Sequence, residues 1–429
     1  MNFYEREVAL MERRIKRIEE QPDPGRLKSN RLLYELMRQE AQTIDDAWKS
    51  GKRFSLSNLP GVMRAMGFYP CGARGTADRV GPELTTKCFD CIRSEGLPEA
   101  CCDRAVMVVP LTTMGEVPMP SFVVADQCVC DQALGSYYAI AHSYGIPMFP
   151  ISFPFEAGEE ELLYVTNQIE EMIEFAEKTF PGVRYDEARL VELQELDRQS
   201  ILCFREIFEL LKLDPCPIDP REAWREILPV SYFLDSERAL TWVKARRDEL
   251  LERAEHHIGA LPEEKLRCIW TVTGYNNDRA PFEYLASRGV ALLFRPDDAG
   301  FRTYNIRYKT YGDESEYMRK LSPLEEVARF KMRSSWGGLA PRWLSDLKFI
   351  IRELKADCLI NFVQSGCVQT IGLAGLATQT IERELGIPVL QLEGRSMLME
   401  SYSRERVLAQ LGEFIDMVLL QERDRPVSD

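Results

Sequence analysis

The sequence predicts an α/β protein with two similar parallel-sheet lobes. Its 429 residues are too many for one ordinary core and fit two or three domains. One pattern occurs twice, at residues 121–149 and 358–390: a short apolar strand, a cysteine, a helix, and Gly-Ile-Pro opening a second apolar strand. This alternation predicts two Rossmann-like (flavodoxin-like) lobes. Each cysteine then stands just past the carboxyl end of a strand, where open α/β sheets bind ligands.

The chain begins with a predicted N-terminal helical arm at residues 1–50, which is charged and carries apolar stripes at helical spacing. Such stripes are usually packing faces, so we expect the arm to cover a domain or a partner subunit. The first α/β lobe is expected at residues 51–157 and contains most of the cysteines. Its predicted strands are Ala105–Val109, Phe122–Ala125 and Ile146–Ile151.

A helical connector is predicted at residues 158–262, because helical periodicity dominates there and prolines separate the helices. Its long helices are expected at Glu159–Lys178, Asp186–Leu213 and Asp235–Ile258. The second α/β lobe is expected at residues 263–429 and ends in an amphipathic helix near 403–421. Its predicted strands are Cys268–Val272, Val290–Phe294, Cys358–Val363 and Val389–Leu392.

The composition and charge of the chain exclude several classes of protein. The net charge of -14 argues against a general nucleic-acid-binding surface. The N-terminus lacks the apolar core of a signal peptide, and no apolar run is long enough to span a bilayer. We therefore expect a cytoplasmic protein that binds neither nucleic acid nor membrane. In that reducing compartment the 12 cysteines are not expected to form a disulfide framework, so metal or cluster ligation is the better interpretation.

The cysteines allow two kinds of metal site. The pair Cys88 and Cys91, with Cys101 and Cys102, would suit a structural zinc ion, although a second C-x-x-C is absent. The ferredoxin run C-x-x-C-x-x-C is also absent, so cysteines far apart in sequence would hold any iron–sulfur cluster. A cluster short of one ligand would have an open iron for Lewis-acid chemistry.

Three segments resemble the family of 2-hydroxyacyl-CoA dehydratase and benzoyl-CoA reductase subunits. They are Cys88–Gly96, the Cys130-Asp131 pair before its helix, and Gln364–Cys367 with the later strand that ends at Glu393. The resemblance implies a 4Fe-4S cluster bound by Cys88, Cys130 and Cys367. Cys91 and Cys128 are alternate ligands. Cys130 and Cys367 each stand where a predicted helix begins, and the helix dipole favours a thiolate there.

The family's chemistry implies an oxygen-sensitive acyl-CoA enzyme of anaerobic metabolism. An ATP-hydrolysing activator supplies a low-potential electron, either for radical dehydration of a 2-hydroxyacyl-CoA or for reduction of benzoyl-CoA. This chain lacks a G-x-x-x-x-G-K-[ST] phosphate loop, as expected if the activator is separate. The implied partners are that activator, the acyl-CoA substrate and a homologous second subunit or a second copy. His142 is a candidate proton donor near the cluster, with a structural histidine as the alternative.

Two departures keep alternatives open. The stretch Leu59–Gly67 lacks the acidic residue that family members usually carry, and Glu393 leads into glycine instead of a nearby aspartate. These changes indicate a divergent substrate, or a subunit whose partner holds the catalytic cluster. A double-cubane cluster reductase of the same superfamily is one alternative, although Tyr317–Gly338 lacks the extra cysteines it needs. A non-catalytic zinc or cluster scaffold is the other.

Overall fold

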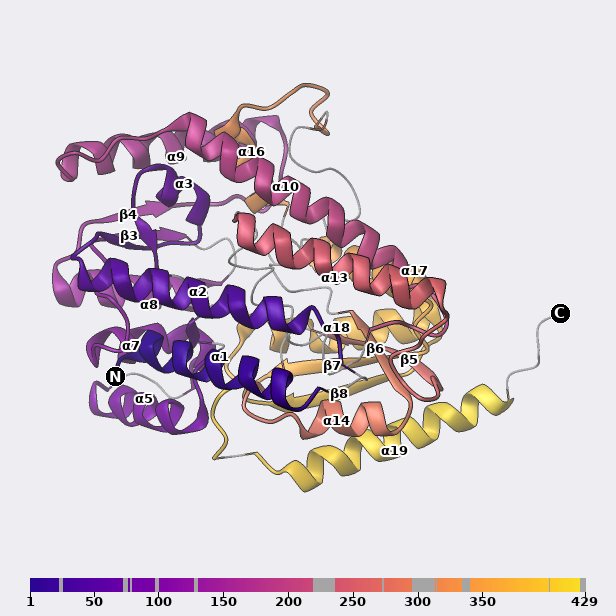
Figure 1. The fold of residues 1–429 in the computed structure, drawn as a ribbon. Helices are drawn as coiled ribbons and strands as arrows, with labels where there is room; N and C mark the ends of the chain where they lie inside the picture. Colours follow the sequence, from indigo (N-terminus) through magenta and orange to yellow (C-terminus); the bar gives the residue numbers. More distant parts are fainter. Residues whose placement is uncertain are drawn as a thin grey trace.

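The computed structural model describes residues 1–22, 26–71, 76–77, 79–96, 100–126, 130–218, 236–271, 274–294, 313, 315–333, 340–400 and 402–424. Within them the chain forms two four-stranded parallel sheets, which confirms the predicted α/β fold with two lobes (Figure 1). The strand orders are β2-β1-β3-β4 and β6-β5-β7-β8, so both lobes repeat one topology. In each sheet the chain first adds a strand on one side and then crosses to the other.

The elements of the first lobe are β1 (Phe54–Leu56), α3 (Pro60–Ala65), β2 (Tyr69–Pro70), α5 (Pro82–Ser94), α6 (Asp103–Val106), α7 (Val108–Thr113), β3 (Phe122–Asp126), α8 (Asp131–Tyr144) and β4 (Met148–Ile151). Those of the second are β5 (Leu266–Thr271), α14 (Ala280–Ser287), β6 (Val290–Phe294), α16 (Pro323–Met332), α17 (Ala340–Glu353), β7 (Cys358–Gln364), α18 (Val368–Leu385), β8 (Val389–Gly394) and α19 (Arg404–Asp424). The arm and connector helices are α1 (Phe3–Glu20), α2 (Asn30–Lys49), α9 (Glu159–Thr179), α10 (Glu187–Leu210) and α13 (Glu237–Glu255).

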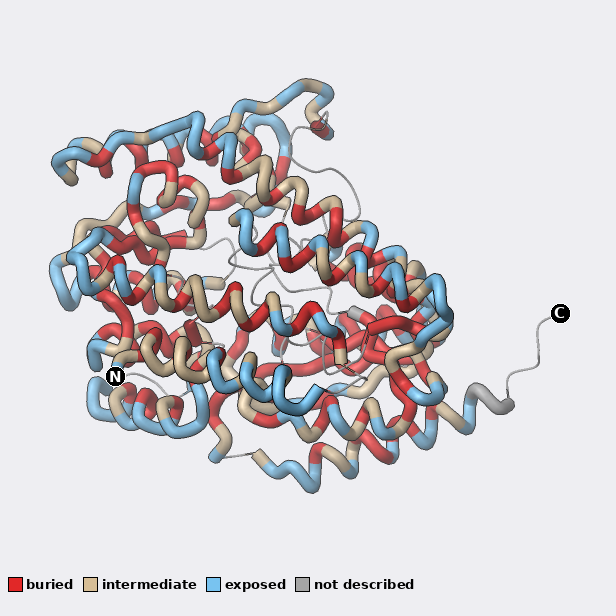
Figure 2. The backbone as a smooth tube through the Cα atoms, in the orientation of Figure 1, coloured by how far each residue is buried: buried red, intermediate tan, exposed pale blue. Residues whose placement is uncertain are grey.

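The central strands β3 and β7 are buried along their whole length (Figure 2). Parallel sheets are covered by helices on both faces, so such strands read as continuous apolar runs. The Gly-Ile-Pro repeats end the helices that follow these strands. Gly145 and Gly386 cap α8 and α18 with φ of 62° and 69°, a left-handed conformation that glycine adopts without steric cost.

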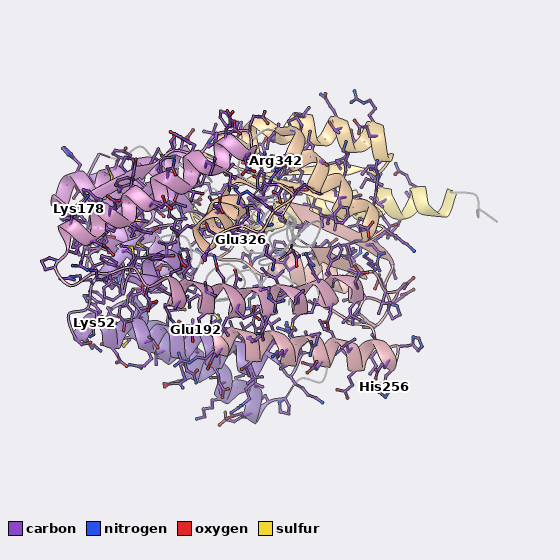
Figure 3. The ribbon with its side chains drawn as sticks, turned by 90° about the horizontal axis from the view of Figure 1, so that it is seen from above. Lys52, Lys178, Glu192, His256, Glu326 and Arg342 are labelled. Atoms are coloured by element: carbon purple, nitrogen blue, oxygen red, sulfur yellow. The ribbon has the colours of Figure 1, made fainter. Side chains whose placement is uncertain are left out.

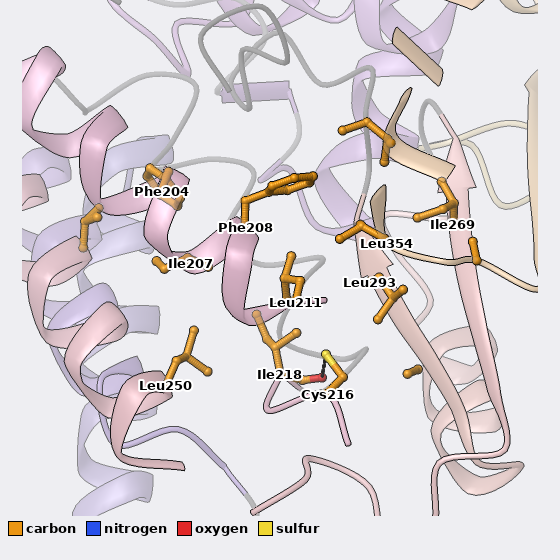
Figure 4. Packing of buried hydrophobic residues seen from close by; sticks show 14 of the residues in the cluster. Phe204, Ile207, Phe208, Leu211, Cys216, Ile218, Leu250, Ile269, Leu293 and Leu354 are labelled. Atoms are coloured by element: carbon orange, nitrogen blue, oxygen red, sulfur yellow. Dashed lines mark hydrogen bonds between the residues drawn. The ribbon is translucent and has the colours of Figure 1, made fainter. Parts of the chain in front are cut away.

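The connector helix α10 joins the two lobes. Near its start, Leu190 packs into the first lobe's core with residues of α3 and α9. Near its end, Phe208 and Leu211 pack beside Leu354 of the second lobe (Figure 4). Figure 3 shows the opposite ends of this helical layer, where Lys178 of α9 and His256 beyond α13 lie far apart. Helix α10 therefore packs on both lobes.

The N-terminal arm also packs on its own chain. Leu33 and Met37 of α2 belong to the core that contains Trp242 of α13 and the second sheet. Phe3 and Tyr4 of α1 belong to a different core, which lies in the first lobe. The arm thus covers both lobes, as its apolar stripes predict for a packing face.

Two segments of the second half of the sequence pack on the first lobe. Helix α16 places Leu324, Ala328 and Met332 in the core formed by α3 and α9. Met397 and Leu398, which follow β8, lie in the core that contains Phe89 of α5. After residue 263 the chain therefore returns twice to the first lobe.

One predicted strand is wrong. Residues Ala105–Val109 lie in α6 and around the start of α7, not in a strand. Short apolar runs do not distinguish a strand from a buried helix. The strand neighbours of β3 are instead the short β1 and the strand β4, and the sequence pattern had not indicated β1.

Candidate functional site

Cys130 and Cys367 occupy equivalent places in the two lobes. Cys130 is the N-cap of α8, beyond the end of β3, and Cys367 is the N-cap of α18, beyond the end of β7. Strands β3 and β7 each lie beside the first strand of their sheet, at the point where the strand order reverses. Ligands of open α/β sheets bind outside the carboxyl ends of strands at this switch point. The structure therefore puts both predicted cysteines at the ligand-binding edge of a lobe.

A third cysteine, Cys102, joins them. It is buried, and it is the N-cap of the short helix α6. Burial is the main cause that raises the pKa of the Cys102 thiol, and negative charge on Asp103, Cys367 and Cys130 raises it further. The hydrogen bonds of Cys102 to Gln364 and Gln132 place it beside the elements that carry the other two cysteines.

The contact surface around these cysteines is called here the interlobe seam. It comprises residues 100–104 of the first lobe with 364–367 and 394–398 of the second, together with residues 130–132, which contact Cys102 through Gln132. Two glutamines fix Cys102 within it. The Gln364 Nε2 lies 3.0 Å from the Cys102 Sγ, and the Cys102 backbone N–H donates to the Gln132 Oε1 at 2.7 Å. Gln364 ends β7 and Gln132 lies in the first turn of α8, so the elements that carry Cys367 and Cys130 also hold Cys102.

Asp103 anchors the same seam. Its carboxylate is fully buried and accepts hydrogen bonds from the backbone N–H groups of Met397 and Leu398 at 2.7 and 3.2 Å. It also accepts from the Gln364 Nε2 at 2.7 Å. Burial is the leading cause that raises the Asp103 pKa, and the two backbone hydrogen bonds oppose it. The carboxylate thus ties the first lobe to two strand-end segments of the second.

At Gly366 the backbones of the two lobes pack directly against each other. This glycine has a φ of +81°, and a Cβ there would lie 2.6 Å from the Ala100 carbonyl oxygen and 2.7 Å from the Cys101 carbonyl. Real Cβ atoms do not approach backbone atoms so closely. Glycine at this position therefore lets the loop before Cys102 pack directly on the turn before Cys367.

The structure does not bring Cys88 to this site. Cys88 is fully buried on α5, in the apolar core that also contains Phe89 and Ile92. Burial, followed by the charges of Cys91 and Glu116, raises the pKa of its thiol to about 12. Cys91 is half-buried one turn further along the same helix. Cys128 lies outside the described residues.

A mononuclear metal site is not formed by the side chains that the structure describes. Among them, no three His, Cys, Asp or Glu residues lie close enough together to hold one metal ion. The zinc arrangement considered for Cys88, Cys91, Cys101 and Cys102 is therefore not assembled. The cysteines of the described residues are all free thiols.

His142 lies away from the cysteines. It is exposed in the last turn of α8, whereas Cys130 caps the opposite end of that helix. Twelve residues of helix correspond to roughly 18 Å at about 1.5 Å per residue. This placement does not support a proton donor next to Cys130.

Sequence reasoning had considered Cys102 as a zinc ligand or as an extra ligand of a double-cubane cluster, not as one of the three ligands of a 4Fe-4S cluster, and it had given no supporting role to Asp103 or Gln132. One signal was present, because Cys-Asp occurs at both 102–103 and 130–131, and in each case it opens a helix. The role of Asp103 could not be predicted from local sequence, because its partners Met397 and Leu398 lie some 290 residues away in the chain.

The protein is a two-lobed α/β protein with three cysteines at helix N-cap positions where its lobes meet. The sequence identifies the family. Residues 61–418 match the sequence model of "2-hydroxyglutaryl-CoA dehydratase, D-component", which covers most of the chain, so the protein belongs to this family. No helix within the described residues is long and apolar enough to cross a membrane.

A curated relative gives a weaker match. The (R)-phenyllactyl-CoA dehydratase alpha subunit of Clostridium sporogenes is 26% identical over 117 residues. The match covers 26% of this chain and 28% of the relative, so the chain matches less than a third of that protein's length. This likeness is to a dehydratase subunit, in agreement with the family.

The close contact at Gly366 gives the first prediction. Gly366→Ala should lower the free energy of unfolding by about 1–3 kcal/mol, because the new Cβ meets the backbone of residues 100–101 at a positive φ. The measurement is urea-induced unfolding. Gly372→Ala is the matched control, since Gly372 lies within α18 with open space around it. This variant should have a free energy of unfolding about 0.5–1 kcal/mol higher than the native protein, because alanine is favoured over glycine inside a helix. Equal stability of the Gly366→Ala variant and the native protein would contradict the close interlobe contact.

Proposed function

We propose that this protein is the iron–sulfur subunit of a 2-hydroxyacyl-CoA dehydratase. Cys102, Cys130 and Cys367 hold a 4Fe-4S cluster at the interlobe seam. The observation that carries the proposal is that Cys102 is hydrogen-bonded to residues next to Cys367 and Cys130, with each cysteine at a helix N-cap position, in a chain of the dehydratase D-component family. Cys102 takes the place that the sequence resemblance gave to Cys88.

The residues present suit such a group. Cysteine thiolates are the usual ligands of iron–sulfur clusters. A four-iron cluster takes each thiolate on a different iron, so its ligands stand further apart than those of a single metal ion. Cys102 and Cys367 are buried, and Cys130 is half-buried.

Each part of the chain has a task in this proposal. When bound, a cluster with three thiolate ligands supplies a low-potential electron and one open iron that polarises an oxygen. The buried seam keeps water from the thiolate ligands, and Gln364 and Asp103 hold the Cys102 loop in place. The helix N-termini at Cys130 and Cys367 favour the negative charge of bound thiolates.

The proposed substrate is a 2-hydroxyacyl-CoA. The family description names 2-hydroxyglutaryl-CoA and the relative's name gives (R)-phenyllactyl-CoA, both of which are 2-hydroxyacyl thioesters. Dehydration removes the hydroxyl from carbon 2 and a hydrogen from carbon 3, and it gives an enoyl-CoA and water. The substrate undergoes no net redox change, so the electron is recovered after each turnover. Neither name concerns benzoyl-CoA, and ring reduction is therefore not proposed.

The proposed enzyme needs partners. The relative is named an alpha subunit, which supports a homologous second subunit here, or a second copy of this chain. The electron comes from a separate ATP-hydrolysing activator, because the sequence contains no G-x-x-x-x-G-K-[ST] phosphate loop. The assembly works in the cytoplasm without oxygen.

Metal analysis tests the cluster. Protein purified without oxygen should contain about four irons and four acid-labile sulfides per chain, with an electron paramagnetic resonance signal after reduction. Cys367→Ser should lose most of the iron, whereas Cys203→Ser should keep it, because Cys203 packs in the helical core. One zinc without sulfide would overturn the proposal. About eight irons would indicate a double-cubane cluster instead.

The choice between Cys102 and Cys88 has its own test. Cys102→Ser should lose most of the iron and sulfide, because this thiol lies beside the elements that carry Cys130 and Cys367. Cys88→Ser should retain the cluster, since Cys88 lies on α5 in a separate apolar core. The comparison is made on anaerobically purified variants of equal helical content by circular dichroism. Loss of iron in Cys88→Ser with full iron in Cys102→Ser would restore the ligand set that the sequence resemblance implies.

Turnover tests the reaction. With its partner subunit and a reduced activator, the chain should convert (R)-phenyllactyl-CoA or 2-hydroxyglutaryl-CoA to the enoyl-CoA, and chromatography should detect the product. Cys367→Ser should reduce the rate at least a hundredfold, while Cys203→Ser should match the native rate. Undiminished turnover by a chain that contains no iron would refute the proposed role of the cluster.

A further inference from the structure

The side-chain amide of Gln364 is enclosed in the interlobe seam and uses all its hydrogen-bonding groups. Gln364 is 1% exposed. Its Nε2 lies 3.0 Å from the Cys102 Sγ and 2.7 Å from the Asp103 Oδ1, so each of its two N–H groups has an acceptor in the first lobe. Its Oε1 accepts from the buried Ser396 Oγ at 3.0 Å.

The surroundings fix which way this amide points. In the opposite orientation its oxygen would face the Asp103 carboxylate and the Cys102 sulfur, both of which are acceptors when ionised. The NH₂ group would then face Ser396. The orientation with Nε2 toward Asp103 and Cys102 is therefore the one that chemistry favours, independently of how oxygen and nitrogen are assigned.

The backbone of Gln364 is also held. It is the last residue of β7, and its N–H and C=O groups lie 3.1 and 3.2 Å from the Thr370 Oγ1 in the first turn of α18. Thr370 also binds the Cys367 carbonyl at 3.2 Å. The amide is thus carried on the same rigid turn as Cys367, and it reaches across the seam to the other lobe's cysteine.

We infer that Gln364 tunes the electron affinity of the cluster proposed above by donating a hydrogen bond to the ligand sulfur of Cys102. The inference rests on the proposed function. A hydrogen bond to a cluster sulfur stabilises the more negative, reduced state and so raises the reduction potential. The effect is greater in a buried site, where the effective dielectric constant is low. Gln364 is a positioning residue, since it acts through Cys102.

The test measures the midpoint potential of the cluster by redox titration monitored by electron paramagnetic resonance. Gln364→Met keeps the length of the side chain and removes the donor, so the potential should shift to a more negative value with iron content unchanged. Gln391→Met is the matched control. Gln391 lies on the neighbouring strand β8, where its amide binds the Thr378 Oγ1 at 2.7 Å, and this variant should keep the native potential.

A second measurement needs no substitution, in case Gln364→Met fails to assemble the cluster. In native protein labelled with ¹⁵N at glutamine side chains, double resonance of the reduced cluster should show one coupled glutamine nitrogen. An unchanged potential in an iron-replete Gln364→Met variant, or no coupled glutamine nitrogen in native protein, would overturn the inference while leaving the cluster itself intact. Absence of a cluster from native protein would instead refute the proposed function.

Discussion

The buried carboxylate of Asp103 is the constraint on which the meeting of the two lobes depends. A carboxylate removed from water is costly unless hydrogen bonds replace its hydration. Here the second lobe supplies those bonds from the backbone of Met397 and Leu398 and from the amide of Gln364. Separation of the lobes would break them together. The neighbouring Cys102 is therefore held where Cys130 and Cys367 can join it.

Gln364 has two roles, because its side-chain amide contacts both Asp103 and Cys102. Gln364 completes the hydrogen bonding of Asp103, which is a structural task, and it touches the sulfur of Cys102, which bears on chemistry. Structure and reactivity are coupled at this residue, because the bond that joins the lobes also sets the charge environment of a proposed ligand. The close packing at Gly366 keeps the distance short enough for that coupling.

The sequence predicted the local elements well and the long-range contacts poorly. The repeated strand, cysteine and helix pattern correctly located β3, β7 and the helices after them, because long apolar runs and Gly-Ile-Pro signals are local. The short strand β1 carries little pattern and was missed, and Ala105–Val109 has an apolar run that suits strand and helix equally. Cys102 could not be placed beside Cys367 from spacing alone, because that proximity depends on how the lobes pack. The distance of His142 from Cys130, by contrast, follows from helix geometry.

The two returns of the chain to the first lobe, through α16 and through Met397 and Leu398, have a consequence for the origin of the molecule. The shared strand order suggests two copies of one ancestral unit. Yet three of the cores formed by the described residues combine apolar side chains from both halves, although one further core lies within each half. The halves have become interlaced, and the molecule can no longer be divided at the middle of its sequence into two self-sufficient proteins.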